Sequence, residues 1–97
     1  MSVAPGRVAA VGAALGTSVG WCAELGVGTV HVACDSVDAF LSARRVAEAQ
    51  GGWMLRESGG PPDDDGFGVP LPNIDVMRRI KRAFDPENKC NPGRLRL

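Results

Sequence analysis

Apolar positions near the start of the chain recur at helical spacing. Val8, Val11 and Leu15 lie three or four residues apart, so they fall on one face of an α-helix. Gly16 follows at the place where a helix commonly ends, because glycine accepts the backbone conformation that such an end requires. The pattern predicts a short helix over residues 7–15.

The next apolar segment has a different period. Residues 27–33, VGTVHVA, are dense in β-branched side chains that alternate between the two faces of an extended chain. His31 lies on one face, and Val30 and Val32 lie on the other. This alternation predicts a strand that is buried on its valine side.

A second helix and a second strand are predicted to follow. Either Asp35 or Ser36 can cap a helix over residues 36–50. The two glycines after Gln50 are typical of a helix C-terminus. Residues 52–58 alternate again and predict a strand, so that strand, helix and strand form a crossover unit. The face of the helix that we expect to pack inward consists of Val37, Phe40, Leu41, Arg44 and Ala47.

Prolines and glycines separate these elements from the end of the chain. Residues 59–72 hold four of each, which excludes a helix or a strand and predicts a surface loop. Asn73 is predicted to cap a last helix. Pro86 is predicted to end that helix at Asp85, because a residue before proline avoids helical geometry. The apolar stripe of the helix consists of Val76, Met77, Ile80, Ala83 and Phe84.

Together these elements predict an α+β fold: a β-α-β unit followed by a C-terminal helix, which amounts to half of a ferredoxin-like cap. We expect residues 1–97 to form one such domain or a fragment of one. Two strands make too small a sheet to be stable alone. We therefore expect an upstream segment, a partner chain or self-association to cover its exposed edge.

The charge distribution excludes some partners and points to others. Eleven basic and eleven acidic residues give no net field that favours nucleic acid or an anionic membrane. The uncharged stretch between Arg7 and Glu24 is shorter than the roughly 20 residues that span a bilayer, so no membrane span is predicted. Residues 1–75 carry net −5 (four arginines against nine acids), whereas residues 76–97 carry net +5 (seven basic residues against two acids). The basic tail is either a solvated helix face that complements the acidic body or a site for an anion or partner.

Residues that usually carry chemistry are sparse. Three cysteines without a CxxC pair and one histidine match no zinc spacing, and the odd cysteine count favours a reduced, cytoplasmic protein over a disulfide framework. The aspartates at 63–65 lack the alternating spacing and distant glutamate of a calcium loop, so no metal site is predicted. Neither a glycine-rich phosphate loop nor a Ser-His-Asp arrangement is visible, and we assign no catalytic residue.

The end of the chain resembles a known family. Residues 80–95, IKRAFDPENKCNPGRL, are similar to the C-terminal signature of FAD-linked oxidases of the vanillyl-alcohol-oxidase type. In that signature a lysine, a Phe-Asp-Pro and an Asn-Pro-Gly-Arg or Asn-Pro-Gly-Lys occur at this spacing. Upstream, WCAELGVGTVHVA, a helix, GGWMLRES and a proline-rich loop resemble the cap region of the FAD-binding subunit of glycolate oxidase, the GlcE-like branch.

The resemblance implies the cap and tail of an FAD-dependent oxidoreductase acting on a 2-hydroxy acid such as glycolate. In that family a separate N-terminal domain binds FAD, and nothing in these 97 residues resembles it. We therefore expect no bound FAD and no activity from this chain alone. The implied partners are an FAD-binding domain or subunit and, as in glycolate oxidase, an iron-sulfur subunit. The alternative is a small non-catalytic α+β module that binds a ligand or a partner.

Carried over residue by residue, the resemblance identifies tail residues. Asn91 and Arg94 match the motif that returns from the cap toward the flavin domain, so they are candidates for lying near flavin or substrate. Asn91 alternatively caps a local turn. Asp85 is expected to accept backbone N–H groups in the following turn, and Phe84 to be a core anchor. The residues expected to have a structural role are Lys81, Phe84, Asp85, Pro86, Pro92 and Gly93, the last with a positive backbone dihedral.

Two further residues have a functional and a structural interpretation. His31 is either a half-buried histidine with its hydrogen bonds satisfied or a contact to substrate or flavin. Arg56 is either a bidentate partner for a substrate carboxylate or a member of a surface or interdomain salt bridge.

Overall fold

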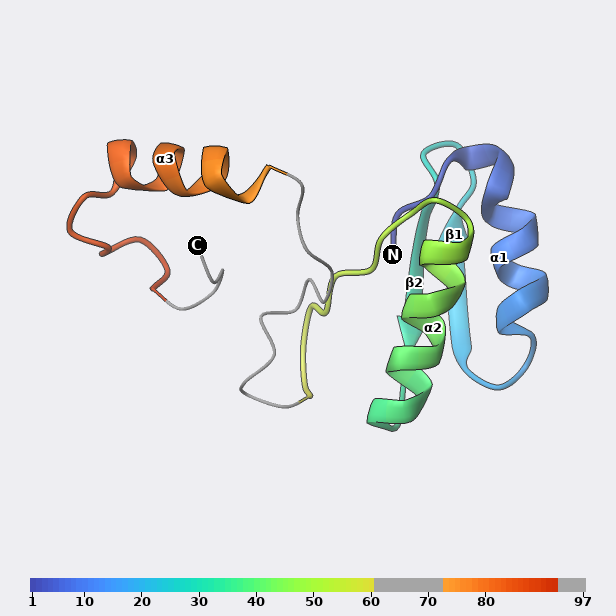
Figure 1. Ribbon diagram of the computed structural model, residues 1–97. Helices are drawn as coiled ribbons and strands as arrows, with labels where there is room; N and C mark the ends of the chain where they lie inside the picture. The colour runs from blue at the N-terminus through green and yellow to red at the C-terminus, as the bar shows by residue number, and fades with distance from the viewer. Residues whose placement is uncertain (61–72, 93–97) are drawn as a thin grey trace. The chain divides into compact units, whose positions relative to one another are not determined.

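A computed structural model describes residues 1–60 and 73–92 of the chain. The chain divides into two compact units, Met1–Leu55 (unit 1) and Arg56–Leu97 (unit 2), and each is described by itself (Figure 1). Within the described ranges, no helix is long and apolar enough to cross a membrane.

Unit 1 begins with the first predicted helix. A 3-10 turn, Pro5–Arg7, leads into α1, Val8–Leu15. Gly16 ends the helix with a φ of 59°, and its N–H donates to the Gly12 carbonyl over 3.0 Å. The predicted stop and the predicted buried face of this helix are both confirmed.

The sheet of unit 1 is an antiparallel hairpin. β2, Thr29–Ala33, lies within the strand predicted over residues 27–33, and its valine side faces the core, with Val30 completely buried. Its partner β1, Gly20–Glu24, was not predicted, because it has no β-branched residue and no clear alternation. Its extended conformation is stabilised by pairing with β2 and not by its own residue types.

A further segment extends this sheet beyond β2. Ser2 forms antiparallel bridges with both Thr29 and Trp53, and the Ser2 and Trp53 N–H groups each donate to the other's carbonyl over 2.8 and 3.0 Å. Trp53 therefore runs in the same direction as β2, as a crossover requires, but Ser2 lies between them. The strand predicted over residues 52–58 is reduced to this one bridge, while the predicted α+β class is confirmed.

The bounds of the crossover helix α2, Val37–Ala49, agree closely with the prediction. Its predicted inward face does not agree fully, because Val37 and Leu41 are 50% and 38% exposed. Of the two candidate caps, the Ser36 hydroxyl is the one that accepts the Ala39 N–H, over 3.2 Å. Gly51, at φ 72°, follows the helix end. The inward face carries a charge, since Arg44 is only 8% exposed and its guanidinium carbon lies 4.5 Å from the centre of the Phe40 ring.

The core of unit 1 lies between the two helices and the valine face of β2. Figure 1 shows α1 and α2 beside the hairpin. Buried side chains come from both helices, from β2 and from the residues that directly follow Ser2 and Trp53. They are Val3, Val8, Val11, Leu15, Val30, Ala43, Ala47 and Met54.

Unit 2 contains α3, Ile74–Phe84, and the turn that follows it. Asn73 occupies the N-cap position, but its side chain makes no capping hydrogen bond, contrary to the prediction. Phe84 was expected to be a core anchor and is instead 87% exposed. The physical reason is that the described part of unit 2 has no second helix or strand to cover the apolar stripe. Val76 and Ile80 are also more than half exposed.

The loop predicted over residues 59–72 lies outside the described residues, apart from its first two positions. These are Gly59 and Gly60, which both have positive φ angles, 68° and 78°. The aspartates at 63–65 also lie outside the described part.

Candidate functional site

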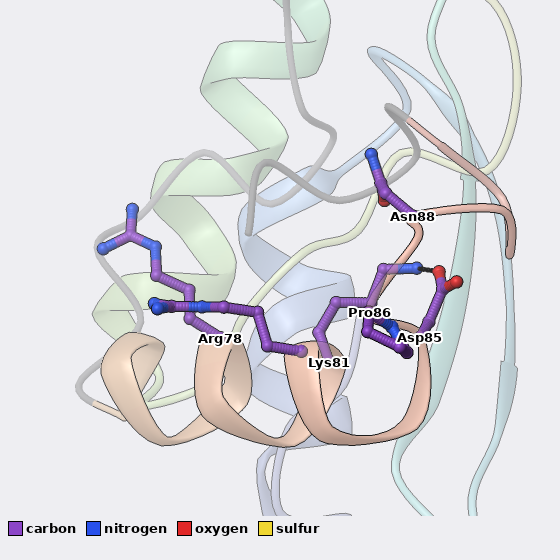
Figure 2. A pocket seen from close by; sticks show the side chains of 6 residues that line it. Arg78, Lys81, Asp85, Pro86 and Asn88 are labelled. Carbon is purple, nitrogen blue, oxygen red and sulfur yellow. Dashed lines mark hydrogen bonds and ion pairs between the residues drawn. The ribbon is translucent and has the colours of Figure 1, made fainter.

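The turn after α3 is built around one carboxylate. The Asp85 side chain accepts the backbone N–H of Lys89 over 2.7 Å and that of Cys90 over 2.9 Å. It also accepts a charge-assisted hydrogen bond from the Lys81 ammonium, drawn as a dashed line in Figure 2. The prediction that Asp85 accepts backbone N–H groups of the following turn is confirmed.

Lys81 completes a closed network. Its ammonium donates to Asp85 and also to the Cys90 carbonyl, over 2.7 Å. The lysine therefore links the last turn of α3 to the chain that returns beside it. We call this group, Lys81, Asp85 and the backbone of 89–90, the Asp85 clamp.

Local sequence explains why the clamp forms here. Asp85 precedes Pro86 and leaves helical geometry, with φ −140° and ψ 66°, as predicted. Its N–H still donates to the Lys81 carbonyl over 2.8 Å, so the helix closes cleanly. Asn88 then takes a left-handed φ of 51°, a conformation that asparagine tolerates better than most residues, and turns the chain back toward the carboxylate.

The carboxylate is held in its charged form. The hydrogen bond from Lys81 is the main cause that lowers the pKa of Asp85, and the N–H of Cys90 adds to it. Only 8% of the Asp85 side chain is exposed, against 26% for Lys81. The negative charge of Asp85 is therefore compensated within the clamp.

A basic pocket lies against the clamp. Its volume is about 330 Å³. Two arginines from successive turns of α3 line it, and Arg78 makes a long, exposed contact of 3.3 Å to Asp75. The lining residues are Arg78, Lys81, Arg82, Asp85, Pro86 and Asn88 (Figure 2).

Two other candidates, His31 and Arg56, lie far from the clamp in sequence. His31 is on the exposed face of β2, and its Nε2 lies 3.7 Å from a Glu24 carboxylate oxygen, with 48% of the histidine side chain exposed. Arg56 is half-buried, and its side chain passes close to Gly60. Since His31 belongs to unit 1 and the two units are described separately, it is not placed relative to the tail, whereas Arg56 is the first residue of unit 2.

The tail candidates are described only in part. Asn91 has a left-handed φ of 46°, which fits the prediction of a local turn. Gly93 and Arg94 lie outside the described residues, so the positive dihedral predicted for Gly93 stays a prediction.

The clamp coincides with a family match. Residues 70–95 match the family model of FAD linked oxidases, C-terminal domain. The matched stretch is about a quarter of the chain and contains α3 and the clamp. A search of curated proteins and a search of solved structures each found no match.

The pocket beside the clamp does not fit FAD. Its volume is at the lower end of the roughly 300–1,000 Å³ of small-molecule pockets. Its lining is charged and offers no aromatic or broad apolar wall for a flavin ring. Among the described residues no cluster of three metal-ligating side chains occurs.

Sequence reasoning missed part of this site. Lys81, Asp85 and Pro86 were predicted from the sequence, and the structure brings them together. Asn88 was not predicted, nor was the placement of Arg78 and Arg82 in one pocket. A four-residue spacing of the two arginines was the available signal, because such residues are neighbours on a helix surface.

Proposed function

We propose that this chain supplies the C-terminal cap and tail of an FAD-dependent oxidoreductase that acts on a 2-hydroxy acid such as glycolate. One observation carries the proposal: the stretch that matches FAD-linked oxidases is also the stretch in which the side chain of Asp85 organises the turn. A network that fixes the direction of the chain after a helix is useful where the following residues must meet another surface.

The role of this chain is then to position groups around a flavin held by another domain. FAD bound in that domain would supply the chemistry that accepts a hydride from the substrate carbon. The Asp85 clamp sets the exit of the tail, so that Asn91 and Arg94 approach the flavin domain. Arg56 is proposed to hold the substrate carboxylate, and His31 to contact substrate or flavin. No residue of this chain is assigned as a catalytic base.

The partners follow from the same proposal. An FAD-binding domain or subunit is required, and an iron-sulfur subunit, as in glycolate oxidase, is proposed as a further partner. Self-association is proposed as one way to cover the free edge of β1, which pairs only with β2 among the described residues. A cytoplasmic location is part of the same proposal.

Co-expression tests the proposal. The chain is produced together with the reading frames that flank it in its genome, and the purified complex is mixed anaerobically with glycolate. We expect a flavin absorption band that is bleached by glycolate and not by acetate, which lacks the hydroxyl group that is oxidised. A complex without flavin would contradict the oxidase assignment. Flavin that no 2-hydroxy acid bleaches would contradict the substrate class alone.

A second candidate function is a non-catalytic module that binds a partner. It is favoured by the stripe on α3, where Val76, Ile80 and Phe84 are 52%, 54% and 87% exposed. Such a helix face is typical of a segment that docks in a groove. A stable complex that contains no flavin, and in which these three side chains are buried, would support this candidate over the oxidase.

A further inference from the structure

Two arginines that line the basic pocket, Arg78 and Arg82, take no part in the Asp85 clamp. We propose that Arg78 and Arg82 form a binding site for a dianionic phosphate group, supplied either by free phosphate or by a small phosphate monoester. This site is independent of the oxidase assignment, because it needs only residues of this chain.

Geometry brings the two arginines together. They lie four residues apart on α3, so their side chains start from neighbouring positions on one face of the helix. Both line the same pocket, as does Asn88 from the returning chain. Figure 2 shows Arg78 and Lys81 on the same side of the helix. Each guanidinium presents a planar set of N–H donors that can grip two oxygens of one phosphate.

The balance of charge leaves the Arg82 guanidinium available to a ligand, while that of Arg78 has to exchange an exposed contact to Asp75. Asp85, the one acidic residue that lines the pocket, is already compensated by Lys81 and two backbone N–H groups. Arg78 has the exposed Asp75 as its partner, whose side chain is 89% exposed. Arg82 makes no ion pair with any residue in the described ranges. The end of α3 adds a partial charge of about −0.5, which is smaller than that of two guanidinium groups.

Charge also selects phosphate over a carboxylate. A phosphate monoester carries about −1.5 to −2 at neutral pH, which matches two guanidinium groups, whereas a carboxylate carries one charge and needs one arginine. The pocket, with a volume of about 330 Å³, is large enough for a phosphate group or a small phosphate monoester. An internal pyrophosphate diester has no terminal dianion, so the site does not imply FAD binding by this chain.

Calorimetric titration of the full chain tests the site. The ligands are inorganic phosphate, glycerol phosphate and glycolate, each in phosphate-free buffer at low ionic strength. We expect binding of phosphate and of glycerol phosphate, and at least about tenfold weaker binding of glycolate. If inorganic phosphate binds and glycerol phosphate does not, the ligand of the site is free phosphate. We also expect binding to weaken as the pH falls below about 6, where the dianion is protonated.

Matched variants locate the binding. Arg82→Gln should weaken phosphate binding about tenfold or more, because one charged donor pair is lost. Arg79→Gln removes the same charge from the same helix outside the pocket and should change it less than about twofold. Asp75→Asn should strengthen binding by releasing Arg78. Circular dichroism checks that each variant keeps its helix.

Three results would overturn the proposal. They are no detectable binding of phosphate to the folded chain, tighter binding of glycolate than of phosphate, and equal losses in the Arg79 and Arg82 variants. The last would mean that diffuse positive charge, and not the pocket, attracts the anion. None of these results bears on the flavin content of a complex, so this proposal and the oxidase proposal fail separately.

Discussion

At the scale of single residues, the Asp85 carboxylate organises the turn after α3. Two backbone N–H groups and the Lys81 ammonium converge on it, and together they explain the lowered pKa. Because the folded-state pKa lies below the ordinary value of about 3.9, the clamp contributes its full stability above that pH. The contribution is lost as the pH falls through the lowered pKa.

An acid titration measures this effect. We expect the amide proton shifts of Lys89 and Cys90 to report a common transition with a midpoint below about 3.9. Asp85→Asn should abolish the transition and speed hydrogen exchange at both amides. Asp75→Asn is the control and should leave the transition unchanged, since within the described residues Asp75 pairs with Arg78 and not with the Asp85 clamp. A midpoint at or above the ordinary value would show that Lys81 does not stabilise the carboxylate.

At the scale of elements, the β1–β2 hairpin depends on the backbone of one glycine. Gly28 has a φ of 77°, and a side chain there would place its Cβ 2.0 Å from the Val3 carbonyl oxygen. Gly28→Ala should therefore lower the free energy of unfolding by about 1–3 kcal/mol. Gly26→Ala, in the same turn with open space around it, should change it by less than about 0.5 kcal/mol. Urea denaturation of both variants measures the difference, and equal effects would refute this account of the turn.

The elements also show how far the sequence predicts the structure. α1 and α2 were predictable because their apolar spacing and end signals are local, as with Gly16 and Ser36. β1 was not, because it is specified by its partner strand and not by its own composition. The backbone partners of Asp85 were predictable in kind, since a short acidic side chain before Pro86 favours bonds to the next turn. The pocket was not, because it depends on where Asn88 returns beside the helix.

At the scale of the whole molecule, the exposed apolar side chains of the described residues offer a test of the proposed partner. Phe84 is 87% exposed at the end of α3, and water contact with such a side chain is unfavourable. In a complex with an FAD-binding domain, Phe84→Ser should weaken assembly, because apolar area that is buried on docking is removed. Leu25→Ser, a change of similar character at a residue 70% exposed in unit 1, is the control and should have little effect. Gel filtration of the co-expressed proteins distinguishes the two variants.

The flavin content of the co-expressed complex tests the central claim most directly. Absorption spectra of the purified complex give the ratio of FAD to chain, for the wild type and for Asp85→Asn, with Asp75→Asn as the control. We expect near-stoichiometric FAD in the wild type and the control, and a several-fold lower ratio in the Asp85 variant, because the tail loses its fixed exit from α3. Absence of FAD from the wild-type complex, or equal FAD in all three proteins, would contradict the account.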